Sequence, residues 1–285
     1  MRLQRLLRNT LGLGVLLIGC TGETPEPAAP DRITPPPPPL TPAIRRVRRL
    51  SSREYNNVVR DLLGDASRPA ARFIRDAYQN GYDNGSAALA VQSDQVADYE
   101  TAAEALAQTA VQTRLTELVS GCDPGQKGYL ACAEALLDSL AARAFRRPLT
   151  ATERQRLLAV FSAELDDGGD FARAIQTLLE VILQSPQFLY REELGPLEAA
   201  PGSATVQLTS YELAAQLSFL LTGSIPDVEL WAAAKQGRLT TPADYRREAV
   251  RLLASPLARD TLRAFLHQWL ATYRTATLSK DPGFY

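Results

Sequence analysis

Apolar residues recur at helical spacing along almost the whole chain from Leu50 onward. The first such segment begins with the capping-box sequence Ser-Ser-Arg-Glu at 51–54 and ends at Gly64, and its apolar face would carry Tyr55, Val58, Val59, Leu62 and Leu63. Further helices are predicted at 93–119 and 129–145. Additional helix starts are predicted near Thr150, Asp170, Thr209, Thr241 and Pro256, each ahead of an apolar segment of helical period.

This pattern predicts an all-α protein, with a multi-helix, bundle-like body of about eight or nine helices that follows a disordered linker. Only 204–208 could pass for a strand. A break rich in glycine and proline at 195–202 predicts the boundary between helical domains at 44–194 and 203–285. The side chains expected to face inward include Val96, Leu220 and, on the last helix, Leu262, Phe265, Leu266, Trp269 and Leu270.

The N-terminus reads as a lipoprotein signal peptide at 1–19 that is followed by a lipidated Cys20. Three arginines precede a short apolar segment at 11–18, and Leu-Ile-Gly-Cys at 17–20 is a lipobox. Two or more acyl chains on Cys20 would hold the protein on a membrane. Thr21, in place of Asp, favours the outer membrane, facing the periplasm or the surface. The alternative is an ordinary cleaved signal with an incidental cysteine.

A proline-rich linker is predicted at 20–43, since nine of the 19 prolines lie between residues 21 and 42. Extended polyproline II structure would let it reach about 70 Å at ~3.1 Å per residue. The linker is interpreted as a spacer between membrane and body, and a PxxP ligand for a partner module in the cell envelope is the alternative.

The charge balance and the scarcity of histidine argue against two classes of function, nucleic-acid binding and metal or haem binding. The chain has 31 basic and 32 acidic residues, which argues against nucleic acid as a partner. A single histidine excludes metal sites with several histidines, and no CxxCH motif is present, so we expect no metal or haem in this segment. His267 lies in an apolar helical segment, where a packed or hydrogen-bonded core role is favoured over catalysis or haem ligation.

With Cys20 assigned to lipid, Cys122 and Cys132 remain, on either side of an Asp-Pro-Gly turn. In an exported domain this predicts a disulfide that joins two consecutive helices. Free buried thiols or a redox-active pair are the alternatives.

Two polar clusters are candidate binding sites. Five arginines near the first helix could hold a phosphate, an anionic lipid or a carboxylate: Arg45, Arg46, Arg48, Arg49 and Arg53. The alternative is a solvated, salt-bridged helix start. The oxygen-rich loop at 76–85 could bind Ca²⁺, although its spacing differs from the EF-hand and also suits plain turns.

Several segments in a fixed order carry a family resemblance. They are 48–64, the Gly-Tyr-Asp-Asn turn at 81–84, Phe-Arg-Arg-Pro-Leu-Thr at 145–150, 183–192, Gly-Ser-Ile-Pro-Asp at 223–227, 265–270 and Lys-Asp-Pro at 280–282. This order resembles secreted bacterial proteins built from domains of unknown function 1587, 1595 and 1592, of the planctomycete cytochrome-associated type.

The resemblance implies an association with c-type cytochromes and names no activity. Such proteins usually continue into a domain with a CxxCH haem motif, so haem c is expected only in a C-terminal part beyond Tyr285, and the 1592-type domain is expected to be truncated. We therefore predict an exported, lipid-anchored binding or scaffold module associated with a cytochrome-like redox assembly. An exported hydrolase of polymers is the alternative, since 32 acidic residues allow many pairs of carboxylates, although no spacing singles one pair out.

Overall fold

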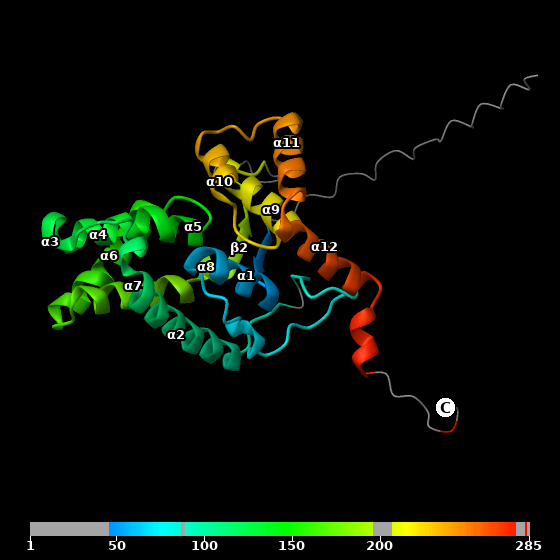
Figure 1. Ribbon diagram of the computed structural model, residues 1–285, viewed down its shortest axis with the longest axis horizontal. Coiled ribbons are helices and arrows are strands. Elements are labelled where there is room, and N and C mark those ends of the chain that lie inside the picture. Colours follow the sequence, from blue (N-terminus) through cyan, green and yellow to red (C-terminus); the bar gives the residue numbers. More distant parts are fainter. Residues whose placement is uncertain (1–45, 87–88, 196–206, 278–282, 284–285) are drawn as a thin grey trace, which may run out of the picture. The chain divides into compact units, whose positions relative to one another are not determined.

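The computed structural model describes residues 46–86, 89–195, 207–277 and Gly283 (Figure 1). Helices make up 67% of the structure and strands 4%, so the all-α prediction is confirmed. The helices are α1 (Ser52–Leu63), α2 (Ser93–Leu118), α3 (Pro124–Lys127), α4 (Tyr129–Leu136), α5 (Ala142–Ala144), α6 (Ala151–Asp166), α7 (Phe171–Gln184), α8 (Pro186–Leu189), α9 (Ser210–Thr222), α10 (Val228–Lys235), α11 (Pro242–Leu253) and α12 (Pro256–Trp269).

The predicted helix starts are those that the structure uses. Ser51, Thr150, Thr209 and Thr241 each accept a hydrogen bond from the backbone N–H three residues on, and the acidic side chain there bonds back to the cap. The predicted helix at 129–145 is built as α4, a π-helical turn at Leu137–Ala141 and α5. Gly64 ends α1 in the left-handed conformation that glycine adopts without strain.

The main hydrophobic core forms where α7 packs along α2 and against α6. The apolar segment predicted after Asp170 forms α7, and its inner face is buried because the helix has neighbours on two sides: Ile175, Leu178, Leu179, Ile182 and Leu183. Tyr55 of α1 packs its ring against those of Phe73, Tyr99 and Phe188, with centroids 5.1 to 5.8 Å apart. This aromatic cluster fixes α1 against the chain segments that flank the candidate site.

A second, smaller hydrophobic cluster lies among α9, α10 and α11. α9 contacts each of α10, α11 and α12, as Figure 1 shows at the yellow to orange end of the chain. Phe219 of α9 and Ile225, however, belong to the main core. The predicted domain boundary at 195–202 stays a prediction.

Two short strands were not predicted from the sequence. β1 (Arg46–Arg49) and β2 (Tyr190–Glu193) pair antiparallel, with Arg48 opposite Arg191. Their sequences, RVRR and YREE, lack the alternation of apolar and polar residues that marks a strand, and the pairing joins segments more than 140 residues apart. The ladder brings the start of α1 beside the end of α8.

Several predicted inward side chains are exposed instead. Val96 is 57% exposed, Leu220 69% and Trp269 63%, and the apolar residues Leu262, Phe265, Leu266 and Leu270 are also exposed. On α9 the buried residues are the small Ala214, Ala215 and Ser218 together with Phe219 and Thr222, so the face that packs is rotated from the leucine face. Helical period identifies an amphipathic face but does not say whether protein covers it.

None of the described helices combines the length and the apolar character that a membrane crossing requires. The predicted signal peptide at 1–19, the lipidated Cys20 and the proline-rich linker lie outside the described residues.

Candidate functional site

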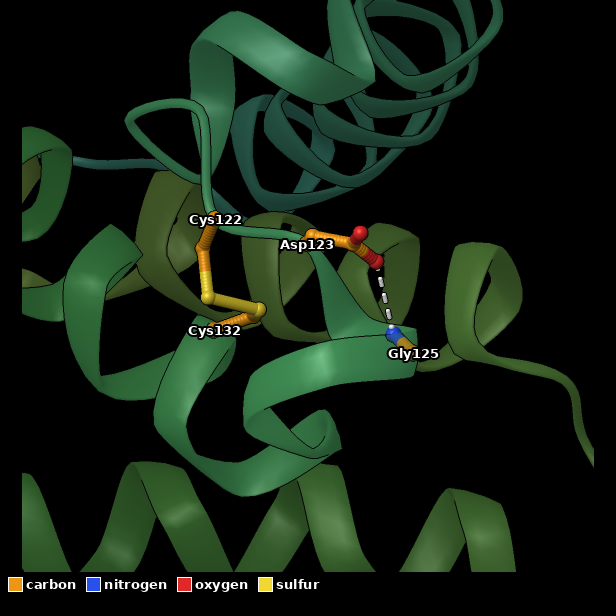
Figure 2. Close-up of a disulfide and its surroundings, with 4 residues drawn as sticks. All are labelled: Cys122, Asp123, Gly125 and Cys132. Atoms are coloured by element: carbon orange, nitrogen blue, oxygen red, sulfur yellow. Dashed lines mark hydrogen bonds between the residues drawn. A yellow bond between two sulfur atoms is a disulfide. The ribbon is translucent and has the colours of Figure 1, made fainter.

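The predicted disulfide is confirmed. Cys122 and Cys132 are bonded, with their Cα atoms 5.3 Å apart, and Figure 2 shows the bridge beside the turn that leads into α3. Asp123 begins that turn, and its Oδ1 accepts a hydrogen bond of 2.9 Å from the Gly125 backbone N–H. Cys132 is fully buried in the main core, so the bridge ties the end of α2 to α4 from the inside.

The arginines of the predicted cluster that the structure describes divide between two places. Arg45 and the side chain of Arg46 lie outside the described residues. Arg48 and Arg49 are adjacent in β1, so their side chains leave the strand in opposite directions and meet different carboxylates. Arg53 lies on α1 and has neither an ion pair nor a hydrogen bond within the described part of the chain.

Arg49 has a structural role. Its guanidinium donates to Asp76 Oδ1 at 2.7 Å, to the Tyr99 hydroxyl at 2.9 Å and to the Leu89 carbonyl, and both charged side chains are almost fully buried. Burial, the largest single effect, would lower the pKa of Arg49, but the hydrogen bonds that Arg49 donates to Asp76 and Tyr99 and the charges of these two groups together outweigh it, so the pKa is raised. Asp76 also accepts from the Ser52 backbone N–H at 2.6 Å. One carboxylate of the proposed calcium loop is thus committed to holding the loop on β1 and α1.

Arg48 and Arg191 converge on Glu54 from neighbouring strands. Arg48 donates to both carboxylate oxygens, at 2.8 and 3.3 Å, and Arg191 Nη1 lies 3.5 Å from Oε1. Burial would raise the pKa of Glu54, but the charges of Arg48 and Arg191 and the Ser51 backbone N–H outweigh it, so the pKa is lowered. Arg191 is also buried, with its guanidinium over the Phe219 ring at 4.4 Å, and its Nε has no partner among the described residues.

A pocket of about 1130 Å³ opens beside this ionic cluster. It is lined by β1, the start of α1, the loop at 79–86, β2, α9 and α12, together with Leu239 and Tyr245. Three arginines and three carboxylates contribute charge: Arg48, Arg53, Arg191, Glu54, Asp83 and Glu193. Leu213, Leu217, Phe219, Leu220 and Phe265 contribute apolar surface. Leu220 of α9 and Phe265 of α12, which were predicted to face inward, therefore line this pocket.

Besides Arg191, two charged groups of the pocket have unpartnered atoms. Arg53 Nε and Asp83 Oδ1 are both buried and lack a hydrogen-bond partner in the described segments. The Asp83 backbone N–H donates to Gln268 Oε1 of α12 at 3.2 Å, which fixes the 79–86 loop to that helix. Tyr82 on the same loop stacks on Phe265 at 6.0 Å between centroids. An unpaired buried charge is costly, so these atoms mark a place where a ligand can supply partners.

The absence of a side chain at Gly223 makes room for the guanidinium of Arg53. A Cβ on Gly223 would lie 2.8 Å from Arg53 Nη1 and 3.3 Å from Asn57 Nδ2. Gly223 ends α9 with a φ of 66°, and its carbonyl accepts from Asn57 Nδ2 at 3.1 Å. The missing side chain therefore lets α9 approach α1 and leaves room for the guanidinium.

His267 does not lie in the core, and this expectation was wrong. It is exposed on α12 near its C-terminal end, where its Nδ1 meets the Thr272 hydroxyl. α12 turns its buried face, with Ala258 and Gln268, toward the body, and His267 falls beside that face. In the described segments no three His, Cys, Asp or Glu side chains come together as a metal site.

Sequence reasoning alone did not single out Arg191, Phe219 and Gln268 as site residues. Arg191 and Gln268 lie within segments that carry the family resemblance, and Phe219 lies shortly before one. This overlap is the signal in the sequence that could have identified them as site residues. Their convergence depends on the β1–β2 ladder and on the packing of α9 and α12, neither of which a local pattern reveals.

Comparison with known proteins gives three family matches and nothing else. Residues 48–112 match a protein of unknown function (DUF1587), residues 132–193 another (DUF1595) and residues 208–285 a third (DUF1592). No curated protein and no solved structure matches the chain. The pocket draws on all three matched segments, through Arg53 and Asp83, Arg191, and Phe219 with Gln268. The chain therefore carries the three domains of unknown function 1587, 1595 and 1592, in the order that its motifs indicated.

Proposed function

We propose that this protein is a lipid-anchored binding module of the bacterial cell envelope, and that its pocket holds an anionic ligand. The observation that carries this proposal is Arg53, a pocket-lining guanidinium with no carboxylate partner in the described part of the chain. A guanidinium binds carboxylate, phosphate and sulfate through a planar fork of donors, and it stays charged at any physiological pH.

The ionic cluster beside the pocket favours binding over hydrolysis. A general acid requires a carboxyl group whose pKa is raised toward neutrality, and the pKa of Glu54 is lowered instead. Glu54 is also held by two arginines and a backbone N–H, so it is not free to exchange a proton with a substrate.

The binding test uses the purified chain in thermal-shift and calorimetric titrations. The probes are a panel of acidic compounds: oligouronates, sulfated glycans, sugar phosphates and dicarboxylates. At least one should bind the native protein and bind Arg53→Gln at least tenfold more weakly. Arg263→Gln is the matched control, because Arg263 is an exposed arginine of α12 paired with Asp260 and is not among the pocket residues. If no acidic probe binds, or if Arg53→Gln binds as well as the native protein, the proposal is wrong.

Anchoring rests on the lipobox at 17–20 and the positive and apolar segments before it. Labelled palmitate should be incorporated into the native protein and not into Cys20→Ala, and the variant should leave the outer-membrane fraction. The association with a c-type cytochrome-like assembly rests on the resemblance alone. Crosslinking in envelope membranes, followed by affinity capture and haem staining, should reveal a haem-bearing partner. A captured set without haem stain contradicts that association.

A further inference from the structure

We propose that the ligand is an acidic saccharide, with Arg53 binding a carboxylate and Asp83 accepting a hydrogen bond from a ring hydroxyl. This inference rests on the proposed function and specifies the ligand of the same pocket. It follows from three properties of the lining: the signs of its unpartnered groups, its amide and hydroxyl side chains, and its apolar wall.

The unpartnered atoms of Arg53 and Asp83 would be satisfied by a ligand that carries both an anionic group and a hydrogen-bond donor. Arg53 supplies a positive charge and Asp83 a negative one, and neither is paired to a side chain within the described ranges. A phosphate or sulfate ion offers acceptor oxygens to Arg53 and would repel Asp83. A sugar that bears one carboxylate offers an anion to Arg53 and hydroxyl donors to Asp83, so both orphaned groups would be satisfied at once.

The neutral polar lining suits a ligand rich in hydroxyls. It consists largely of side chains that donate and accept: Gln79, Asn80, Asn84, Gln216, Thr261 and Gln268. A sugar hydroxyl also donates and accepts, so each such side chain can pair with one hydroxyl. Gln268 is held by its bond to the Asp83 backbone, and Arg48 donates to the Asn84 carbonyl at 3.2 Å, so the loop that carries Asn80 and Asn84 is tied at two points.

The apolar wall matches the C–H face of a pyranose ring. Tyr82 and Phe265 stack on one another and both line the pocket, and Leu213, Leu217 and Leu220 of α9 also line it. Leu220 remains 69% exposed, although a soluble surface rarely leaves so large an apolar group beside other apolar groups. The pocket volume of about 1130 Å³ lies above the range of roughly 300–1,000 Å³ for drug-sized ligands. More than one sugar ring therefore fits.

The experiment compares trigalacturonate with its fully methyl-esterified form in calorimetric titrations of the full chain. The ester keeps the ring and the hydroxyls and removes the negative charge. We expect the native protein to bind the acid about 10- to 100-fold more tightly than the ester. In Arg53→Gln this preference should disappear, whereas Asp83→Asn should weaken the binding of acid and ester alike. Arg263→Gln should behave as the native protein, and circular dichroism verifies that each variant is folded.

The outcomes separate this inference from the proposed function. Equal binding of acid and ester by the native protein overturns the saccharide inference, as does an acid preference that survives in Arg53→Gln. If only sulfated or phosphorylated probes bind and their binding depends on Arg53, the saccharide inference falls and the anion-binding function stands. If no acidic probe binds at all, both are wrong.

Discussion

Glu54→Gln tests whether the ionic cluster beside the pocket holds the fold together. The change keeps the shape of the side chain and its capping role, because a glutamine at this position still accepts from the Ser51 backbone N–H. It removes the negative charge that faces Arg48 and Arg191. Glu54 is 3% exposed, so at this buried site Arg48 would be left without a counter-charge and Arg191 would keep only Glu193. Breaking a buried ion pair from one side costs about 3–5 kcal/mol.

The chain contains a matched control. Arg48 and Glu54 stand in the pattern Arg-x-Leu-Ser/Thr-x-x-Glu, and Arg147 and Glu153 repeat it at 147–153. Both glutamates close a capping box, and both accept two hydrogen bonds from the arginine six residues earlier, Glu153 at 2.8 and 2.9 Å. Glu153 is 17% exposed and Arg147 29%, so the second pair is far better solvated. We expect Glu153→Gln to cost no more than about 1 kcal/mol.

Urea unfolding followed by circular dichroism measures both variants. The free energy of unfolding should fall by about 3 kcal/mol for Glu54→Gln, which corresponds to roughly 6–12 °C in Tm for a body of this size. Equal losses for the two variants, or a larger loss for Glu153→Gln, would refute the reasoning, because the local geometry is the same and the pairs differ in burial and in the second arginine, Arg191, that faces Glu54. An unchanged urea dependence confirms that the unfolded states are comparable.

The pH dependence of stability gives a second test of the role of Glu54, because the lowered pKa fixes its direction. The pKa of Glu54 is lowered in the fold, so its contribution is fully present above its ordinary pKa of 4.5 and is lost as the pH falls through the lowered value. The difference in stability between the native protein and Glu54→Gln should therefore be constant near pH 7 and shrink in acid below about pH 4.5. A difference that grows in acid contradicts the assigned direction.

Three further predictions concern the scaffold. Replacing both Cys122 and Cys132 by alanine should lower the free energy of unfolding by about 3 kcal/mol at most, and dithiothreitol should shift the Tm of the native protein but not that of the variant. Gly223→Ala should destabilise more than Gly237→Ala in urea unfolding, since both glycines have a φ above 60° but only the first would crowd its neighbours; equal losses contradict this. Arg146→Met should cost at least ~3 kcal/mol, because this buried arginine donates to four backbone carbonyls, and a loss below ~1 kcal/mol by the same measurement refutes that role.

The helices were predictable because their signals are local. Capping boxes at Ser51, Thr150 and Thr209 identified three starts to the residue, and the turn between Cys122 and Cys132 identified the disulfide. The β1–β2 ladder was not predictable, since four-residue strands rich in charge are defined by their partner and not by their sequence.

The site was predictable only in part. Arg53 was among the five arginines selected from sequence, but nothing local distinguishes it from Arg48, which is ion-paired. The two copies of the Arg-x-Leu-Ser/Thr-x-x-Glu pattern show why a local pattern does not locate the site. In each copy the arginine donates two hydrogen bonds to the glutamate, and tertiary packing buries the first pair, beside a pocket, more deeply than the second.

The three matched segments behave physically as parts of one structural unit. Arg191 of the second matched segment lies between Glu54 of the first and the Phe219 ring of the third, at 3.5 and 4.4 Å. Removing the third segment would expose the Phe219 side of Arg191, and removing the first would leave this guanidinium without Glu54. Gly223 and Asn57 link the third segment to the first in the same way, at the position that seats Arg53. The pocket and its ionic cluster thus give a physical reason for these three segments to occur together in one chain, since each completes a charge or a surface that the others leave open.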